Sequence, residues 1–302
     1  MPEIIVGVDG SARGEDALAF AEQLARTTGA NLALASAFPY QDWPSRAASH
    51  EYREYLRQDT LAMLERMRAK LQDPQVPVQA LADPTPARAL HLLAEQDRAS
   101  LIVIGSSHRG RTGRVLLGST AERLLHGAPC PVAVVPHGYP ADAPIETIGV
   151  GYDGSEESDA AVTAAHVVAR RLGSSLKVIR VFDAYVVGTP ALMSGPGYAA
   201  AWEEYEAFGR EDLERRVAAL GGDVTAEAVF LTGSPGRELA AQTAGVDLMV
   251  LGARGYGPHR AVLLGGVSHV VLREAACPVL VLPRGSRQGV QELFADTRTA
   301  HA

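Results

Sequence analysis

The sequence predicts an α/β fold built from two repeated open doubly wound domains, each a five-stranded parallel sheet with helices on both faces. Three motifs that each occur twice indicate the repeat. A Val-Gly-x-Asp-Gly-Ser segment that begins at Val6 recurs at Val150, 144 positions later. A glycine-rich loop and a Cys-Pro-Val segment both recur after 147 positions, as from Cys130 to Cys277. A chain of 302 residues is long enough for two domains of ordinary size.

Apolar runs of strand length alternate with amphipathic segments of helix length in both copies. Apolar runs without alternation are typical of strands buried on both faces of a parallel sheet. In the first copy we expect strands at residues 4–8, 32–38, 76–81, 101–104 and 132–135, with helices at 14–28, 45–71, 86–96 and 119–126. In the second copy we expect strands at 147–152, 176–182, 225–230, 248–251 and 279–282, with helices at 156–172, 199–220, 236–243 and 267–275. Gly29 and Gly127 are expected to cap helix C-termini.

The same pattern sets the domain boundaries. Residues 138–144 contain a glycine and two prolines, which suits a short stiff linker. We therefore expect a first domain at residues 1–137 and a second at 145–285. The polar residues 286–302 are expected to form a flexible tail. Residues 188–197 are rich in glycine and proline and predict a surface loop.

Composition narrows the classes of partner. A formal net charge of −7 argues against nucleic acid, whose phosphates need a basic surface. No apolar run approaches the roughly 20 residues of a membrane-spanning helix. The first residues carry neither a basic segment nor a cleavage site, so we expect a cytoplasmic protein. Cys130 and Cys277 precede apolar strands at equivalent positions and are expected to be buried, reduced thiols.

In doubly wound folds a ligand lies beyond the carboxyl ends of the strands, where the strand order reverses. Asp9 follows the first predicted strand and Gly105 follows the fourth. Asp153 and Gly252 hold the same places in the second copy. One crevice in each domain is therefore expected to contain both residues. Each aspartate has a simpler alternative role, because Asp-Gly-Ser often forms an Asx turn or caps the next helix.

Gly118-Ser119-Thr120 opens a predicted helix. Free backbone amides, the positive end of the helix dipole and two hydroxyls make this segment a plausible phosphate cradle. The chain has no Gly-Lys-Ser or Gly-Lys-Thr, and its lysines are Lys70 and Lys177, so a Walker-type loop is excluded.

The chain resembles a tandem universal stress protein over residues 3 to about 283. The resemblance rests on the Val-Gly-Val-Asp-Gly-Ser start, the Gly-x2-Gly-x9-Gly-Ser/Thr loop and the Cys-Pro-Val strand. These motifs or close variants of them occur in this order twice. It implies the strand order 3-2-1-4-5 and, in one branch of the family, ATP bound in the crevice, with or without Mg²⁺. The residues that it implies for the first domain are Asp9, Ala37, Gly105, His108, Gly118, Ser119 and Thr120. For the second domain they are Asp153, Val181, Gly252, Gly255, Gly265, Gly266 and Val267.

Two positions depart from the family's loop. His108 stands where the first domain should have its second glycine, and a histidine is costly there if the backbone needs a positive φ. A protonated imidazole beside a triphosphate would instead act as a donor. Gly266 stands where the second domain should have Ser or Thr, which removes a hydroxyl and keeps the backbone amide.

The resemblance and the residues leave three functions open. The first is an ATP-binding regulatory protein of the stress response, the second a scaffold with degenerate pockets, and the third a very slow ATPase. No catalytic triad or metal-ligand spacing is evident. We expect the last strands to join the two domains as an internal pseudo-dimer, with a homodimer and an unknown protein partner beyond that. Aromatic residues of the long helices, Trp202 and Tyr205 among them, are expected to face the core or the solvent.

Overall fold

The computed structural model describes residues 3–40, 50–106, 118–183, 196–253 and 265–283, with the backbone alone described for 196–201. The first half contains β1 (Glu3–Gly7), α1 (Ala12–Thr28), β2 (Asn31–Phe38), α2 (His50–Arg68), β3 (Val78–Ala82), α3 (Pro86–Asp97), β4 (Leu101–Gly105), α4 (Ser119–Leu125) and β5 (Val132–Val135). The second half contains β6 (Thr147–Gly151), α5 (Glu156–Leu172), β7 (Ser175–Phe182), α6 (Pro196–Ala218), β8 (Ala226–Thr232), α7 (Pro235–Gln242), the short 3₁₀ helix η1 (Thr243–Gly245), β9 (Leu248–Gly252), α8 (Gly266–Glu274) and β10 (Val279–Leu282).

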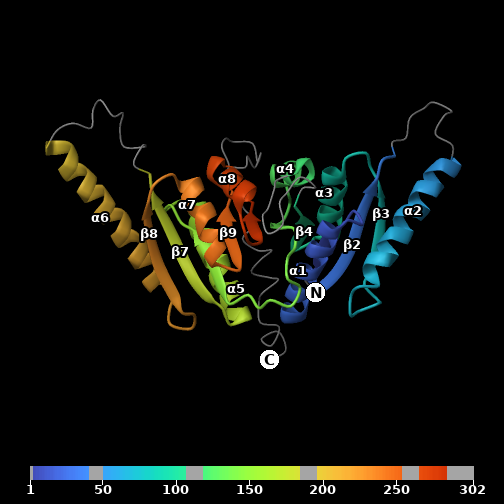
Figure 1. Cartoon of the computed structure of the whole chain (residues 1–302), viewed down its shortest axis with the longest axis horizontal. Coiled ribbons are helices and arrows are strands. Elements are labelled where there is room, and N and C mark those ends of the chain that lie inside the picture. Colours follow the sequence, from blue (N-terminus) through green and yellow to red (C-terminus); the bar gives the residue numbers. More distant parts are fainter. Residues whose placement is uncertain (1–2, 41–49, 107–117, 184–195, 254–264, 284–302) are drawn as a thin grey trace.

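The strands form one ten-stranded sheet in the order β3-β2-β1-β4-β5-β10-β9-β6-β7-β8. Pairing is parallel within each half, which confirms the predicted fold and the order 3-2-1-4-5 in both copies. The halves meet where β5 and β10 pair antiparallel, with Val134 opposite Val279. Every residue of these two strands is buried, because helices cover both faces of the sheet there. Figure 1 shows α2 and α6 at the two outer ends of the molecule.

Each face of the sheet carries a core that runs through both halves. On one face the core includes residues of α1, α2 and α5, and on the other face it includes residues of α3, α4, α7 and α8. Cys130 and Cys277 are free and buried in the second of these cores, as expected. Burial raises the pKa of both thiols to about 12, so they stay protonated at neutral pH. Among the helices of the described ranges, none has the length and apolar character needed to cross a bilayer.

The segment that joins the halves is held at both ends by carboxylates. Asp16 of α1 accepts hydrogen bonds from the backbone nitrogens of Gly138 and Tyr139, at 2.8 and 3.1 Å. The Nδ1 atom of His137 lies 2.9 Å from the same carboxylate. At the other end, Asp247 accepts from the backbone nitrogens of Glu146 and Thr147. Ionised acceptors make stronger hydrogen bonds than neutral ones, so these two aspartates fix the path of the chain between the halves.

Helix boundaries differ from the predicted ones where capping decides them. The helix α1 begins two residues earlier than expected, because the Ser11 side chain caps it. Gly29 caps the same helix with a φ of +72°, as expected. The prediction for Gly127 was wrong in detail: His126 is the C-cap of α4, and Gly127 only donates its amide to Leu124.

The helix α6 begins at Pro196, inside the segment predicted as a loop. A proline is compatible with the first turn of a helix, where its missing N–H has no partner to lose. Residues 188–195 of that loop lie outside the described residues, as do the predicted tail and the first part of the predicted helix 45–71.

We predict that Asp16→Ala lowers the free energy of unfolding by about 2 kcal/mol, because it leaves two backbone amides and an imidazole without their acceptor. Urea denaturation measures the change. Asp142→Ala removes an exposed carboxylate from the same segment and is the matched control, with an expected change within about 0.5 kcal/mol. Equal effects of the two substitutions would contradict the role assigned to Asp16.

Candidate nucleotide site at the strand ends

A cavity of about 380 Å³ lies at the carboxyl ends of β6, β7 and β9. The order of the strands reverses here, because the chain runs from β6 outward to β7 and β8 and then returns to β9 on the other side of β6. Such a switch point is where open α/β sheets bind ligands. The sequence-predicted residues that line the cavity are Asp153, Val181, Gly252, Gly265, Gly266 and Val267.

The N-terminus of α8 opens onto this cavity. Gly265 is the N-cap and offers no side chain, so no side-chain hydrogen bond satisfies the first amides of the helix. Gly266, Val267 and Ser268 line the cavity in the first turn. By contrast, α5 is capped by its own residue, since the Ser155 hydroxyl accepts from the Ser158 amide at 3.2 Å. Of these two helix ends at the cavity, α8 is therefore the one left open for an anion.

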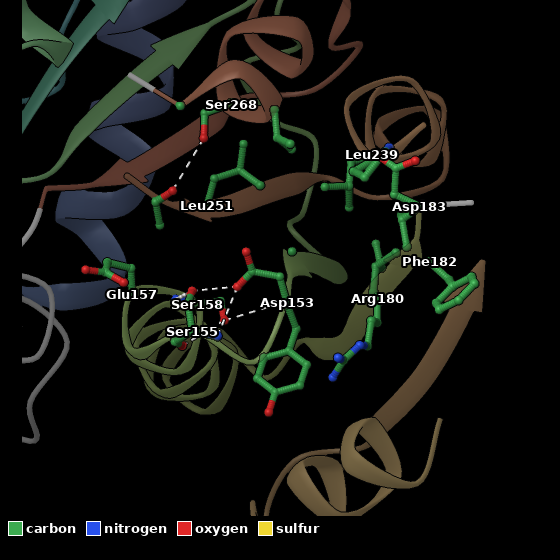
Figure 2. A pocket seen from close by; sticks show the side chains of 18 of the residues that line it. Asp153, Ser155, Glu157, Ser158, Arg180, Phe182, Asp183, Leu239, Leu251 and Ser268 are labelled. Carbon is green, nitrogen blue, oxygen red and sulfur yellow. Dashed lines mark hydrogen bonds between the residues drawn. The ribbon is translucent and has the colours of Figure 1, made fainter. Parts of the chain in front are cut away.

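Asp153 lies on the strand side of the same cavity. Its Oδ1 accepts hydrogen bonds from the Ser155 amide at 3.0 Å and the Ser155 hydroxyl at 2.5 Å. Asp9 accepts the corresponding bonds from Ser11 at 3.0 and 2.6 Å. The Asx-turn interpretation is thus confirmed for both aspartates. Figure 2 shows the Asp153 carboxylate between Ser155 and Ser158 on one side and Arg180 on the other. The turn fixes the carboxylate at the cavity, where it can accept hydrogen bonds from a ligand.

Gly252 and Gly105 have a packing role that the motif alone did not indicate. A β-carbon on Gly252 would lie 2.7 Å from the carbonyl oxygen of Glu157, in the first turn of α5. A β-carbon on Gly105 would overlap the carbonyl oxygen of Arg13 in α1. These glycines let the first helix of each half approach the fourth strand closely. Gly266 is different, because a β-carbon there would meet no atom within 4 Å.

In the first half, the predicted residues lie at equivalent places on the fold. Asp9 follows β1, Ala37 lies in β2 and Gly105 ends β4, and these three strands are neighbours in the sheet. Gly118 is the N-cap of α4, without a side-chain cap. Ser119 and Thr120 form the first turn of that helix. His108 and Gly255 lie outside the described residues.

The sequence analysis missed a polar cluster on the α6 side of the cavity. Arg180 of β7 lines the cavity and forms an ion pair with Asp212 of α6. The Tyr152 hydroxyl donates to Asp212 at 3.1 Å, and the Arg180 guanidinium lies 5.6 Å from the centre of the Tyr152 ring. Burial, followed by the charge of Asp212, raises the pKa of Tyr152, so it remains a neutral donor. The one available signal was an arginine two positions before the end of the strand at Phe182, within its apolar last residues Val178–Phe182.

Tyr205 also lines the cavity, although it was expected to face the core or the solvent. It lies 5.3 Å from the ring of Phe182, and Trp202 packs edge-on against Phe182 at 4.5 Å. The exposed fraction of Tyr205, 51%, reflects its position at the rim of the cavity.

We predict that Gly252→Ala lowers the free energy of unfolding by about 1–3 kcal/mol, because the added methyl group would push the first turn of α5 away from β9. Gly266→Ala adds the same methyl group where there is space and should change stability by no more than about 0.5 kcal/mol. Thermal and urea denaturation of the two variants provide the comparison. A destabilisation by Gly266→Ala equal to that by Gly252→Ala would contradict the packing described.

Comparisons with family models and with curated proteins point to the same family. The universal stress protein family matches residues 1–136 and 144–283. A universal stress protein of Mycolicibacterium smegmatis is 31% identical over 290 residues, covering 92% of this chain and 96% of the relative. One from Mycobacterium bovis is 35% identical over 192 residues, which cover 61% of this chain and 62% of the relative's own length.

Solved structures support the fold. A universal stress protein from Archaeoglobus fulgidus superposes with a TM-score of 0.62 at 21% identity, covering 94% of this chain and 96% of that chain. A Pseudomonas aeruginosa protein superposes with a TM-score of 0.65 at 18% identity and covers 98% of both chains. The repeated motifs, the paired sheets and the two family matches lead to one conclusion: the chain belongs to the universal stress protein family and carries two of its domains in tandem.

Proposed function

We propose that this protein binds ATP at the strand ends of its two halves as a regulatory ligand of a cytoplasmic stress response. The observation that carries the proposal is the uncapped N-terminus of α8, which faces Asp153 across one cavity. Amides and a carboxylate at the two sides of a cavity suit a ligand with phosphates at one end and hydroxyls at the other. In the first half, the N-terminus of α4 at Gly118 likewise has no side-chain cap.

Electrostatics support binding of the phosphates at the helix end. Asp153, Glu157 and Asp183 line the cavity of the second half, and each carboxylate would repel a triphosphate. The amides of α8 and its helix dipole favour negative charge. The triphosphate therefore binds best against α8, with the ribose hydroxyls donating to Asp153 and Mg²⁺ screening the phosphates from the carboxylates.

Regulation by binding requires no chemical step. A ligand that binds only the folded state at 100 times its Kd stabilises that state by about 2.7 kcal/mol. Such a change in stability, or in the arrangement of loops and dimers, is a signal that a protein partner can detect. The scaffold and slow-ATPase alternatives become outcomes of the experiments below.

Chromatography of the supernatant after denaturation of the purified protein tests the proposal. We expect released adenine nucleotide in an amount close to two per chain if both halves are filled, and close to one if a single half is filled. No released nucleotide, together with no thermal shift on addition of MgATP, would contradict the proposal and favour the scaffold. Release of ADP that increases with incubation of added ATP would indicate the slow ATPase.

Gly265→Asp should abolish nucleotide binding in the second half and leave the fold intact. The backbone of Gly265, with φ −63° and ψ 151°, suits an aspartate N-cap. That side chain would take up the amides of α8 and add a charge beside the phosphates, while contributing roughly a few tenths of a kcal/mol of capping stability relative to glycine. Gly118→Asp should act in the same way in the first half. Calorimetric titration with MgATP measures the loss.

Gly265→Asn is the matched control, because it caps the helix without adding charge. We expect it to weaken binding less than Gly265→Asp does. Unchanged affinity for MgATP in the Gly118→Asp, Gly265→Asp double variant would show that neither helix N-terminus takes part in binding.

A further inference from the structure

The cavity of the second half extends to a hydrogen-bond donor at the end away from α8. That donor is Arg180, whose side chain has an exposed fraction of 15%. In the described part of the chain, its side-chain hydrogen bond goes from Nη1 to Asp212. Arg180 lines the cavity, and its partly exposed guanidinium carries further N–H groups besides the one bonded to Asp212. A guanidinium can only donate, so a ligand group at this place must be an acceptor.

The charges around Arg180 decide what kind of acceptor fits. Asp212 neutralises the guanidinium, and Asp153 lies in the lining of the same cavity. A further phosphate at this place would be repelled by these two carboxylates. Among the described residues that line the cavity, the cation is Arg180, and it is already paired with Asp212. A neutral acceptor, such as a ring carbonyl, gains the hydrogen bond without that repulsion.

The walls beside Arg180 suit a flat ring. Phe182 and Tyr205 line the cavity here, and Gly209 of α6 presents no side chain to it. A β-carbon on Gly209 would lie 3.4 Å from Nε of Arg180 and 3.3 Å from the ring of Phe230, so a larger residue would crowd this end. Aromatic side chains beside an arginine form a surface on which bases stack.

The first half does not share this chemistry. By the 144-residue offset, Ser36 corresponds to Arg180 and Val8 to Tyr152. Met63 of α2 lies against Gly10 as Asp212 lies against Gly154. The polar cluster of the second half is therefore replaced by a serine and two apolar side chains, and the two halves offer different surroundings to the same part of a ligand.

We propose that Arg180 is a specificity-determining residue and that the second half prefers a nucleotide whose base is a 6-oxopurine, guanine or hypoxanthine. Arginine pairs with the O6 and N7 acceptors of such a base, whereas adenine places an amino donor at the O6 position. The first half, with Ser36, has no such preference, and the second half still binds ATP, but less tightly than a 6-oxopurine nucleotide. This inference rests on the proposed nucleotide binding, since it assumes that the phosphates lie against α8.

The test compares ATP with ITP, which carries a 6-oxo group where ATP carries the 6-amino group. Calorimetric titrations with Mg²⁺ use the full chain with Gly118→Asp, so that only the second half can bind. We expect ITP to bind at least tenfold more tightly than ATP, and GTP to follow ITP. The full chain with Gly265→Asp, in which only the first half can bind, is the internal control and should show no preference for ITP.

Arg180→Met, added to the Gly118→Asp chain, should bring the affinities for ATP and ITP within about twofold of each other, because the donors are lost. If that variant fails to fold, Arg180→Ser with Asp212→Met gives the second half the residues of the first and should have the same effect. Equal affinities in the Gly118→Asp chain, or a preference for ITP that survives these substitutions, would overturn the role of Arg180 and leave nucleotide binding in place. Binding of neither nucleotide would overturn the proposed function of this half as well.

Discussion

The architecture depends on the antiparallel pairing of β5 with β10. An exposed edge strand invites association with other chains, and here the two apolar edge strands satisfy each other within one molecule. Because the pairing makes one sheet of two, the helices of both halves build continuous cores on its two faces. The carboxylates of Asp16 and Asp247 bind the two ends of the linker and hold the chain in the path that this pairing requires.

Within each half, two helices begin at the same edge of the sheet, and their capping gives them different roles. The first helix is capped by its own serine and is drawn close to the fourth strand by a glycine, Gly105 or Gly252. The last helix begins after an N-cap glycine, Gly118 or Gly265, which has no side chain to bond the first amides. The motif therefore combines a packing function in one glycine with an uncapped helix end at another, and the proposed phosphate site lies at that helix end.

Most of the fold could be predicted from the sequence, but the polar cluster on the α6 side of the cavity could not. The elements and the repeat followed from local patterns, since apolar runs and caps act over a few residues, and the strand order was implied by the resemblance to the universal stress protein family. Gly265, which was predicted for the phosphate end, belongs to the repeated motif, and it lines the cavity. Arg180, Asp212 and Tyr205 come from separate elements with no shared spacing, and only the packing of α6 on β7 brings them together. Boundaries such as the start of α6 at Pro196 depend on that packing as well.

Backbone amide chemical shifts, measured by two-dimensional NMR during titration with MgATP, test the central claim most directly. If the phosphates bind at the open helix end, the largest shifts will occur at Gly266, Val267 and Ser268, while the self-capped first turn of α5, at Glu156 and Glu157, changes little. Shifts that are absent from α8, or that are larger in α5, would contradict the account, because the ligand would then lie elsewhere.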